Sequence, residues 1–252
     1  ILFIIYLDQL LQMNHLILVR HGQSVWNLQK RFTGWVDVEL TDQGKSEARK
    51  AGELIKKLDL KINSFFCSYQ KRAINTLELI LNIIDSKLNQ ITKAWELNER
   101  HYGELTGLNK DQMKKVYGEK KIHAFRRSWD MSPAPLEKNN PNHPLNIAIY
   151  KNIPKDKIPD TESLKDTYKR TIYYYSKNIE PLIQNNQNVL ISAHGNSLRT
   201  ICKKLFNISN KNISKLEIPT GNPLLIKFKN NLRIDSCRYL DSSRSKDLLV
   251  KF

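Results

Sequence analysis

The sequence predicts a single α/β domain in which a mainly parallel sheet is covered by helices on both faces, a three-layer α/β/α arrangement. Residues 15–22 and 188–195 are both aliphatic runs that end in His-Gly. Each run has the length and branched composition of a buried strand, and a helical pattern follows each. Similar alternation along the chain is typical of a parallel sheet. The chain has 252 residues, of which 40% are hydrophobic, enough for one large core.

The first half of the chain continues with helix, strand, helix and strand. A helix is expected from Thr41, a suitable N-cap, to about Leu58, because apolar residues recur there with a period of 3.6. Residues 62–67 have the pattern of a second buried strand. The helix after it carries Arg72 in its first turn, and a further strand is expected within 88–97.

The second half contains a long irregular stretch between helices. Residues 109–129 are helical in pattern and basic. Residues 132–159 are rich in Pro, Asn and Lys, so we expect a lid, a binding loop or a disordered segment. A helix is expected over 161–183, with an end or a kink at Pro181. Two closing strands are expected at 223–228 and 232–240.

These elements place the domain at residues 15–240. Residues 1–14 are expected to be a non-native or disordered extension, because Met13 directly precedes the first strand and suits a natural start. Residues 241–252 are expected to form a flexible tail.

The amino-acid composition limits the cellular location and the classes of binding partner that we expect for this chain. The net charge of +16 could attract nucleic acid, anionic membranes or small anionic substrates. Abundant lysine alone explains most of that charge. The three cysteines have no metal-site or redox spacing, so we expect free thiols in a reducing cytoplasm. No apolar run is long enough to cross a bilayer.

The candidate site lies where the strands end. In an open α/β sheet, ligands bind outside the carboxyl ends of the strands, so His21 and His194 are expected to meet in one crevice. Arg20 and Arg72 also follow strands, and their forked guanidinium groups suit phosphate oxygens. Ser24 and Asn27 add neutral donors at a helix start, where phosphate is favoured. This combination predicts transfer of a phosphoryl group through a histidine.

Other cofactor chemistries have no support in the sequence. No HxH or HExxH motif occurs, and no cluster of Asp and Glu accompanies the two histidines. Walker and GxGxxG loops are also missing. We therefore expect neither a metal nor a nucleotide cofactor.

The chain resembles the phosphoglycerate mutase branch of the histidine phosphatase superfamily. The resemblance extends from about His15 to Tyr239 and includes the run Leu-Val-Arg-His-Gly-Gln-Ser-Val-Trp-Asn. It rests on residues 18–27, 32–35, 71–74, 97–103, 126–127 and 218–221. The resemblance implies that residues 15–240 form a phosphoglycerate mutase-like catalytic domain.

The resemblance implies interconversion of 2-phosphoglycerate and 3-phosphoglycerate, in glycolysis and gluconeogenesis, with 2,3-bisphosphoglycerate as primer and no metal. His21 would carry the phosphoryl group as phosphohistidine. Arg20, Arg72, Asn27 and His194 would hold the phosphoryl oxygens. Glu99 would be the general acid and base toward the substrate hydroxyl.

The resemblance also implies a substrate-binding set. Arg100, Tyr102, Lys110, Arg126 and Arg127 would contact the glycerate carboxylate and the distal phosphate. The remaining expected ligand contacts are Ser24, Thr33, Gly34, Gly195 and Asn196. The expected partners are small phosphorylated three-carbon acids and a second copy of the chain, as a dimer or tetramer, with neither nucleic acid nor membrane.

Two alternatives remain at this point. A phosphatase on the same fold would let water attack the phosphohistidine, but it would need neither the Arg126-Arg127 pair nor the turn 99–103. A basic nucleic-acid-binding module would need a recognisable motif such as a helix-turn-helix, and none is present.

Overall fold

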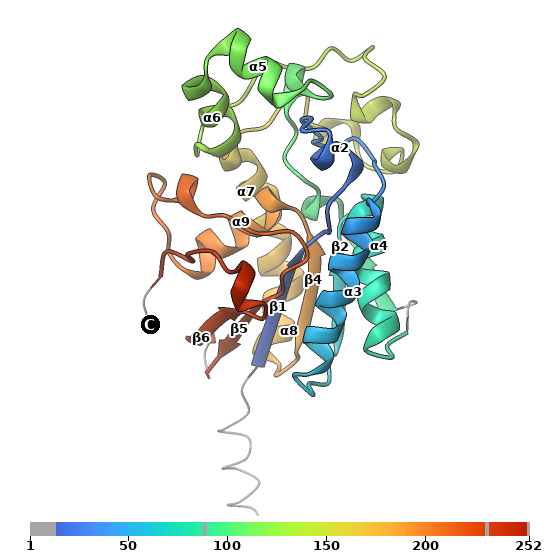
Figure 1. Ribbon diagram of the computed structural model, residues 1–252, viewed down its shortest axis with the longest axis vertical. Helices are drawn as coiled ribbons and strands as arrows, with labels where there is room; N and C mark the ends of the chain where they lie inside the picture. The colour runs from blue at the N-terminus through green and yellow to red at the C-terminus, as the bar shows by residue number, and fades with distance from the viewer. Residues whose placement is uncertain (1–13, 88–89, 230–231, 251–252) are drawn as a thin grey trace, which may run out of the picture.

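The computed structural model describes residues 14–87, 90–229 and 232–250. Its centre is a six-stranded sheet with helices on both faces (Figure 1), which confirms the predicted fold class. The strands are β1 (Asn14–Arg20), β2 (Ser64–Cys67), β3 (Ile91–Lys93), β4 (Val189–Ala193), β5 (Leu224–Phe228) and β6 (Ile234–Tyr239). Their order across the sheet is β3-β2-β4-β1-β5-β6.

The sheet is mainly parallel, and its parallel part creates the site. β1 pairs with β4, and β2 pairs with β3 and β4, all in parallel. β5 is antiparallel to both β1 and β6. The carboxyl ends of β1, β2 and β4 therefore meet at one edge, where the loops that begin with His21, Ser68 and His194 start.

Helices cover the two faces because successive side chains of a strand point to opposite sides. The helices are α2 (Val25–Leu28), α3 (Asp42–Lys56), α4 (Lys71–Ile83), α5 (Lys110–Tyr117), α6 (Glu119–Arg127), α7 (Leu164–Tyr174), α8 (Glu180–Gln184) and α9 (Gly195–Leu205). Ile17 and Val19 of β1 pack under α3 and α4, whereas Leu16 and Leu18 pack under α7, α8 and α9. In Figure 1, α2, α5 and α6 lie beyond the carboxyl edge of the sheet.

Two of the expected helices are interrupted, one near a proline and the other at a glycine. The helix expected over 161–183 is divided into α7, a π-helical turn Tyr175–Ile179, and α8. Pro181 lacks an N–H and its ring crowds the preceding turn, so the wider π turn accommodates it. The basic stretch 109–129 breaks into α5 and α6 at Gly118, whose φ is +81°.

The strand expected within 88–97 is β3. Residues 88–89 lie outside the described part of the chain. β3 occupies only three residues, and a 3₁₀ turn, Trp95–Leu97, then leads toward the candidate site.

Residues 132–159 contain only 3₁₀ turns, as an irregular segment should, but they are packed against the domain. Tyr150 is fully buried, and its hydroxyl donates to the carbonyl oxygen of Trp35. His143 is also fully buried, with Nε2 3.0 Å from Oδ1 of Asp160. The buried side chains of Tyr150 and His143 therefore hold the segment against the rest of the domain.

Burial of His101 beside His143 predicts an acid-sensitive fold. Burial and the neighbouring His143 lower the pKa of His101 to about 3, against 6.5 for the unfolded side chain. Below pH 6.5 the unfolded chain binds a proton that the folded chain refuses, so stability falls as the pH falls. His101 should contribute a loss of about 1.4 kcal/mol per pH unit in the free energy of unfolding.

The measurement is urea unfolding of the wild type and His101→Asn at pH 7 and pH 5. The asparagine oxygen can still accept the Gly103 N–H that Nδ1 of His101 accepts at 3.0 Å. The variant should show the shallower pH dependence, whereas His123→Asn, a change at an exposed histidine, is the control. Equal slopes in the wild type and His101→Asn would contradict the assignment.

The two ends of the domain differ from the expected boundaries. Asn14 is the first residue of β1 and is buried, so it does not belong to the extension expected at 1–14. Residues 1–13 lie outside the described part of the chain. The tail from Asp241 is docked rather than frayed at its start. Asp241 pairs with Lys50, and Nη2 of Arg244 donates to the Thr220 carbonyl oxygen at 2.7 Å.

Candidate active site

The two histidines of the repeated His-Gly pattern meet at the carboxyl edge of the sheet. The ring centroids of His21 and His194 are 4.9 Å apart, and the ring planes are inclined by 57°. Both side chains are buried, at 2% and 0% exposure. The backbone N–H of His21 donates to the Ala193 carbonyl oxygen at 2.9 Å, so the ends of β1 and β4 hold the two loops together.

The surroundings of His21 define its protonation. Its Nδ1 lies 2.7 Å from the carbonyl oxygen of Gly22, which can only accept a hydrogen bond, so Nδ1 carries the proton and Nε2 keeps its lone pair. Burial, followed by the charges of Arg72 and Arg20, lowers the pKa of His21 well below its ordinary value. The side chain is therefore a neutral imidazole with a free Nε2.

His194 is held in a similar neutral state. Burial lowers its pKa well below the ordinary value, and Arg72 and His21 lower it further. Its Nε2 lies 2.7 Å from Oγ of Ser68, which follows β2. Nδ1 of His194 is buried and has no hydrogen-bond partner among the described residues.

Two arginines are fixed beside the histidines through backbone carbonyl groups. Arg72 is 1% exposed and donates from Nη1 to Val36 and from Nη2 to Gly34, at 2.8 and 2.9 Å. Arg20 donates from Nη1 to the carbonyl oxygen of Ile218 at 2.9 Å, and its buried Nε has no partner in the described chain. Both guanidinium groups are thus oriented by carbonyl oxygens, and among the described residues neither forms an ion pair with a carboxylate.

Gly22, which follows His21, lies where two backbone segments approach each other closely. A Cβ built on Gly22 would lie 2.1 Å from the carbonyl oxygen of Gly44 in α3. Gly22 is therefore required because the His21 loop lies directly against the first turn of α3.

Glu99 and Asn196 join two loops that are distant in sequence. Oε1 of Glu99 accepts the backbone N–H groups of Arg100 at 2.8 Å and of Asn196 at 3.2 Å. Nδ2 of Asn196 donates to the hydroxyl oxygen of Tyr102 at 3.1 Å. The turn that carries Glu99 is thereby connected to the first turn of α9, directly after His194.

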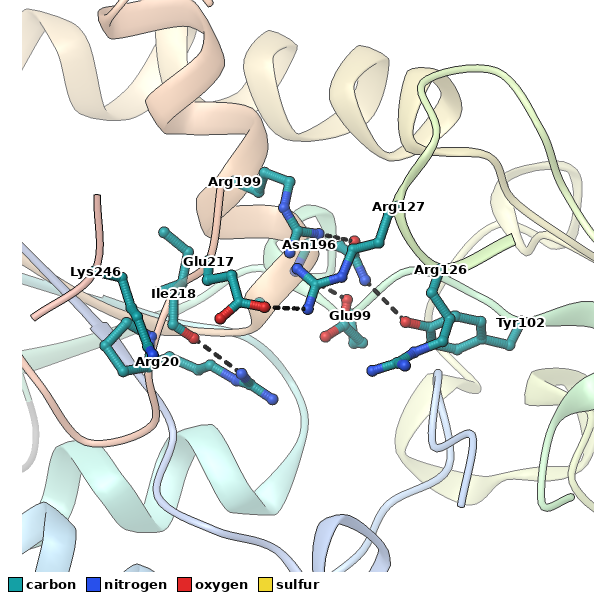
Figure 2. A pocket seen from close by; sticks show the side chains of 12 residues that line it. Arg20, Glu99, Tyr102, Arg126, Arg127, Asn196, Arg199, Glu217, Ile218 and Lys246 are labelled. Carbon is teal, nitrogen blue, oxygen red and sulfur yellow. Dashed lines mark hydrogen bonds and ion pairs between the residues drawn. The ribbon is translucent and has the colours of Figure 1, made fainter. Parts of the chain in front are cut away.

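A pocket of about 230 Å³ opens beside the histidines, and its walls are strongly basic. Figure 2 shows the lining side chains arranged around Glu99. Glu99 and Glu217 are the carboxylates of the lining, and Glu217 is already paired with Arg127 at 3.0 Å. The lining residues are Arg20, Glu99, Tyr102, Arg126, Arg127, Gly195, Asn196, Arg199, Glu217, Ile218, Pro219 and Lys246. Such a cavity suits a small, multiply charged anion.

Seven of the predicted site residues line this pocket, whereas the predicted catalytic residues His21, His194 and Arg72 are not part of its lining. Buried Arg100 donates from Nη2 to the Phe125 carbonyl oxygen, and its Cζ lies 4.9 Å from the centre of the Tyr102 ring. Lys110 donates to the Arg31 carbonyl oxygen. Burial, followed by charges that include Arg126, lowers the pKa of Lys110 to about 8.

The two residues predicted to supply neutral donors at the helix start, Ser24 and Asn27, also cap α2. Oγ of Ser24 accepts the Asn27 N–H at 3.3 Å, and Oδ1 of Asn27 accepts the Ser24 N–H at 3.2 Å, which is a capping box for α2. Thr33 is buried, and Gly34 supplies the carbonyl oxygen that orients Arg72. The capping box uses the side-chain oxygens of Ser24 and Asn27 only as acceptors, so it does not occupy the Nδ2 group of Asn27.

Sequence reasoning missed several pocket residues. Arg199 is 4% exposed and donates to Leu216 from Nε and to Asn196 Oδ1 from Nη1. The sequence could have identified Arg199, because this residue follows Asn196 by three positions and so lies on the same side of α9. Glu217 and Lys246 had no such signal, since only the tertiary fold brings them to the pocket.

Within 14–87, 90–229 and 232–250, no group of three or more His, Cys, Asp or Glu side chains could hold a metal ion. In the same ranges, every helix is too short or too polar to cross a bilayer.

Comparison with known sequences identifies relatives over nearly the whole chain. A family model described as the histidine phosphatase superfamily (branch 1) matches residues 16–143. A 2,3-bisphosphoglycerate-dependent phosphoglycerate mutase of Pelagibacter ubique is 62% identical over 94% of this chain and 100% of that protein. A protein of the same name from Hydrogenobaculum is 48% identical over 89% and 91% of the two chains.

Solved structures support the fold. A mycobacterial glucosyl-3-phosphoglycerate phosphatase superposes with a TM-score of 0.68 at 19% identity, covering 90% of this chain and 97% of that one. A putative alpha-ribazole-5'-P phosphatase from Escherichia coli gives a TM-score of 0.67 at 20% identity, with coverage of 91% and 96%. At these identities the likeness concerns the fold alone.

Proposed function

The chain belongs to the 2,3-bisphosphoglycerate-dependent phosphoglycerate mutases within branch 1 of the histidine phosphatase superfamily, and we propose that its His21 carries the phosphoryl group during catalysis. The reaction is the interconversion of 2-phosphoglycerate and 3-phosphoglycerate in glycolysis and gluconeogenesis. One observation carries the proposal. The hydrogen bond from Nδ1 of His21 to Gly22 leaves a neutral Nε2 with its lone pair, next to His194 and two arginines. That nitrogen is the nucleophile.

The chemical step follows from these groups. Nε2 of His21 attacks phosphorus, the bond from phosphorus to the substrate oxygen breaks, and that oxygen takes a proton from Glu99. Arg20, Arg72, Asn27 and His194 hold the three phosphoryl oxygens, whose charge is best stabilised in the transition state. In the reverse step the phosphoryl group leaves Nε2 for a substrate hydroxyl, and Glu99 takes back the proton.

The site fits a doubly phosphorylated three-carbon acid. Nε of Arg20, Nδ1 of His194, and Nε and Nη1 of Arg100 are buried nitrogens that lack partners among the described residues. Ligand oxygens would satisfy the N–H donors of this set, and the basic pocket would balance the ligand charge. When bound, 2,3-bisphosphoglycerate supplies the phosphoryl group that first loads His21. Arg126, Arg127 and Lys110 would hold the far end of this ligand.

The direct test is an assay of the purified protein on 3-phosphoglycerate. Turnover should depend on added 2,3-bisphosphoglycerate and should not change with a chelator. Turnover that requires a divalent cation and ignores the bisphosphate would contradict the proposal.

Arg127→Ala tests the substrate-binding role. Arg127 lines the pocket, and Glu217 and the Leu216 carbonyl oxygen hold its guanidinium in place. Removing a charged hydrogen-bond donor should raise KM for 3-phosphoglycerate about 10- to 10²-fold and change kcat less. Steady-state kinetics would separate the two constants.

The matched control for Arg127→Ala is Lys120→Ala, which removes an exposed cation from the same helix, α6. If Arg127→Ala left KM at the control value, Arg127 would not belong to the substrate site.

We propose the cytoplasm as the location, because the relatives carry the name of a glycolytic enzyme. The expected partners are small phosphorylated acids rather than nucleic acid or membrane. The homo-oligomer, a dimer or tetramer, stays a prediction of the family resemblance.

A further inference from the structure

Arg170 of α7 donates three hydrogen bonds from its guanidinium group to the chain segment that carries Glu99. Nη1 donates to the carbonyl oxygens of Glu96 at 2.7 Å and Asn98 at 3.0 Å. Nη2 donates to the Glu99 carbonyl oxygen at 3.0 Å. Three carbonyl groups within four residues are therefore fixed by one side chain.

Glu162 completes this arrangement from the other side. Its two carboxylate oxygens accept from Nε and Nη2 of Arg170, at 2.6 and 2.9 Å. Oε2 also accepts the backbone N–H of His101 at 2.7 Å. The Arg170 and Glu162 side chains are 9% and 4% exposed, so this ion pair is shielded from water.

The Arg170–Glu162 pair binds backbone groups of Glu99 and of residues on both sides of it. Carbonyl groups of Glu96, Asn98 and Glu99 are held by Arg170, and the N–H of His101 is held by Glu162. The Glu99 carboxylate itself points elsewhere, toward the N–H of Asn196. The pair thus contacts the backbone of the turn and leaves the carboxylate free for the ligand.

We propose that Arg170 and Glu162 are positioning residues for the proton transfer that Glu99 performs. This inference rests on the proposed function, in which Glu99 protonates the leaving oxygen. The pair sets where the carboxylate stands relative to the phosphoryl group on His21. A displacement of about 1 Å in such a group can cost about 10²-fold in rate.

The geometry requires an arginine. Five donors in a planar fork meet five acceptors here, two from one carboxylate and three from the backbone. A lysine would keep the positive charge beside Glu162 but offers three donors on one nitrogen, so it cannot serve all these groups.

The experiment compares two phosphoryl donors in Arg170→Lys. The leaving oxygen of 3-phosphoglycerate or 2-phosphoglycerate needs a proton, whereas 4-nitrophenolate leaves without one. Turnover of 3-phosphoglycerate should fall about 10²-fold in kcat. Loading of His21 from 4-nitrophenyl phosphate, followed as the burst of nitrophenolate, should change by no more than about threefold, because it needs no general acid.

Controls separate positioning from folding. Thermal unfolding reports whether Arg170→Lys is folded, and a poorly folded variant is replaced by the double variant Arg170→Met with Glu162→Gln, which buries no unpaired charge. Lys204→Met breaks another ion pair, the one with Glu180 at 3.1 Å, and should leave the rates with both phosphoryl donors unchanged. A parallel loss with both donors, or no loss with either, would overturn the inference.

Glu99→Gln distinguishes this inference from the proposed function. Suppose that Glu99→Gln lowers the rate with 3-phosphoglycerate but not with 4-nitrophenyl phosphate, and that the Arg170 variants show no such difference. Then only the role of Arg170 and Glu162 is wrong. If Glu99→Gln itself shows no difference between the two phosphoryl donors, Glu99 is not the general acid, and both proposals fall.

Discussion

Turnover of 3-phosphoglycerate is expected to fall by on the order of 10⁶-fold in His21→Ala, the size of effect seen when an enzyme loses its nucleophile. The alanine removes Nε2, the nitrogen whose lone pair the hydrogen bond to Gly22 keeps free. The variant should still fold, because a smaller side chain in this position leaves the backbone bond from residue 21 to Ala193 intact. Coupled assays with extensively purified protein measure the residual rate.

A second measurement makes the same point without turnover. Wild-type protein incubated with labelled 2,3-bisphosphoglycerate should acquire acid-labile label, and His21→Ala should acquire none. His123→Ala, at an exposed histidine, should behave as the wild type. Labelling of the His21→Ala variant to the wild-type level would show that another residue carries the phosphoryl group.

Glu99→Gln is expected to lower kcat for 3-phosphoglycerate by about 10²- to 10⁴-fold, the usual contribution of general acid and base catalysis. Glutamine keeps an oxygen that can accept the N–H groups of Arg100 and Asn196, but it cannot exchange a proton with the substrate. The loss should therefore appear in kcat more than in KM, and it should be small for 4-nitrophenyl phosphate. Stopped-flow and steady-state kinetics measure both effects.

The matched control is Glu104→Gln, an exposed carboxylate five residues further along. A loss of the same size with both donors in Glu99→Gln would indicate a damaged site rather than a missing proton. No loss with 3-phosphoglycerate would remove Glu99 from the chemistry.

The parts of the fold that were predictable are those with a local signal. Aliphatic runs and 3.6-residue periods indicated the strands and most helices, and Pro181 marked the interrupted one. The meeting of His21 and His194 followed from a general property of parallel sheets, because both residues directly follow strands.

The parts that were not predictable depend on contacts between distant residues. Gly22 is explained by the approach of α3, and Lys246 reaches the pocket from a tail with no repeating pattern. Arg170 appears in the sequence as one more cation on a helix, and only the fold brings three carbonyl groups to it. Periodicity reports which face of a helix is buried but not which backbone groups lie opposite.

The central place of β1 has a consequence for how the site can open. Residues 16–19 of β1 are at most 1% exposed and lie between β4 and β5, where backbone groups are released only when the whole domain unfolds. Arg126 and Arg127 belong to α6, which packs mainly against α5 at the periphery. His21 and the two arginines that we propose to bind the ligand therefore belong to differently packed regions, and we expect α6 to open locally more readily than β1.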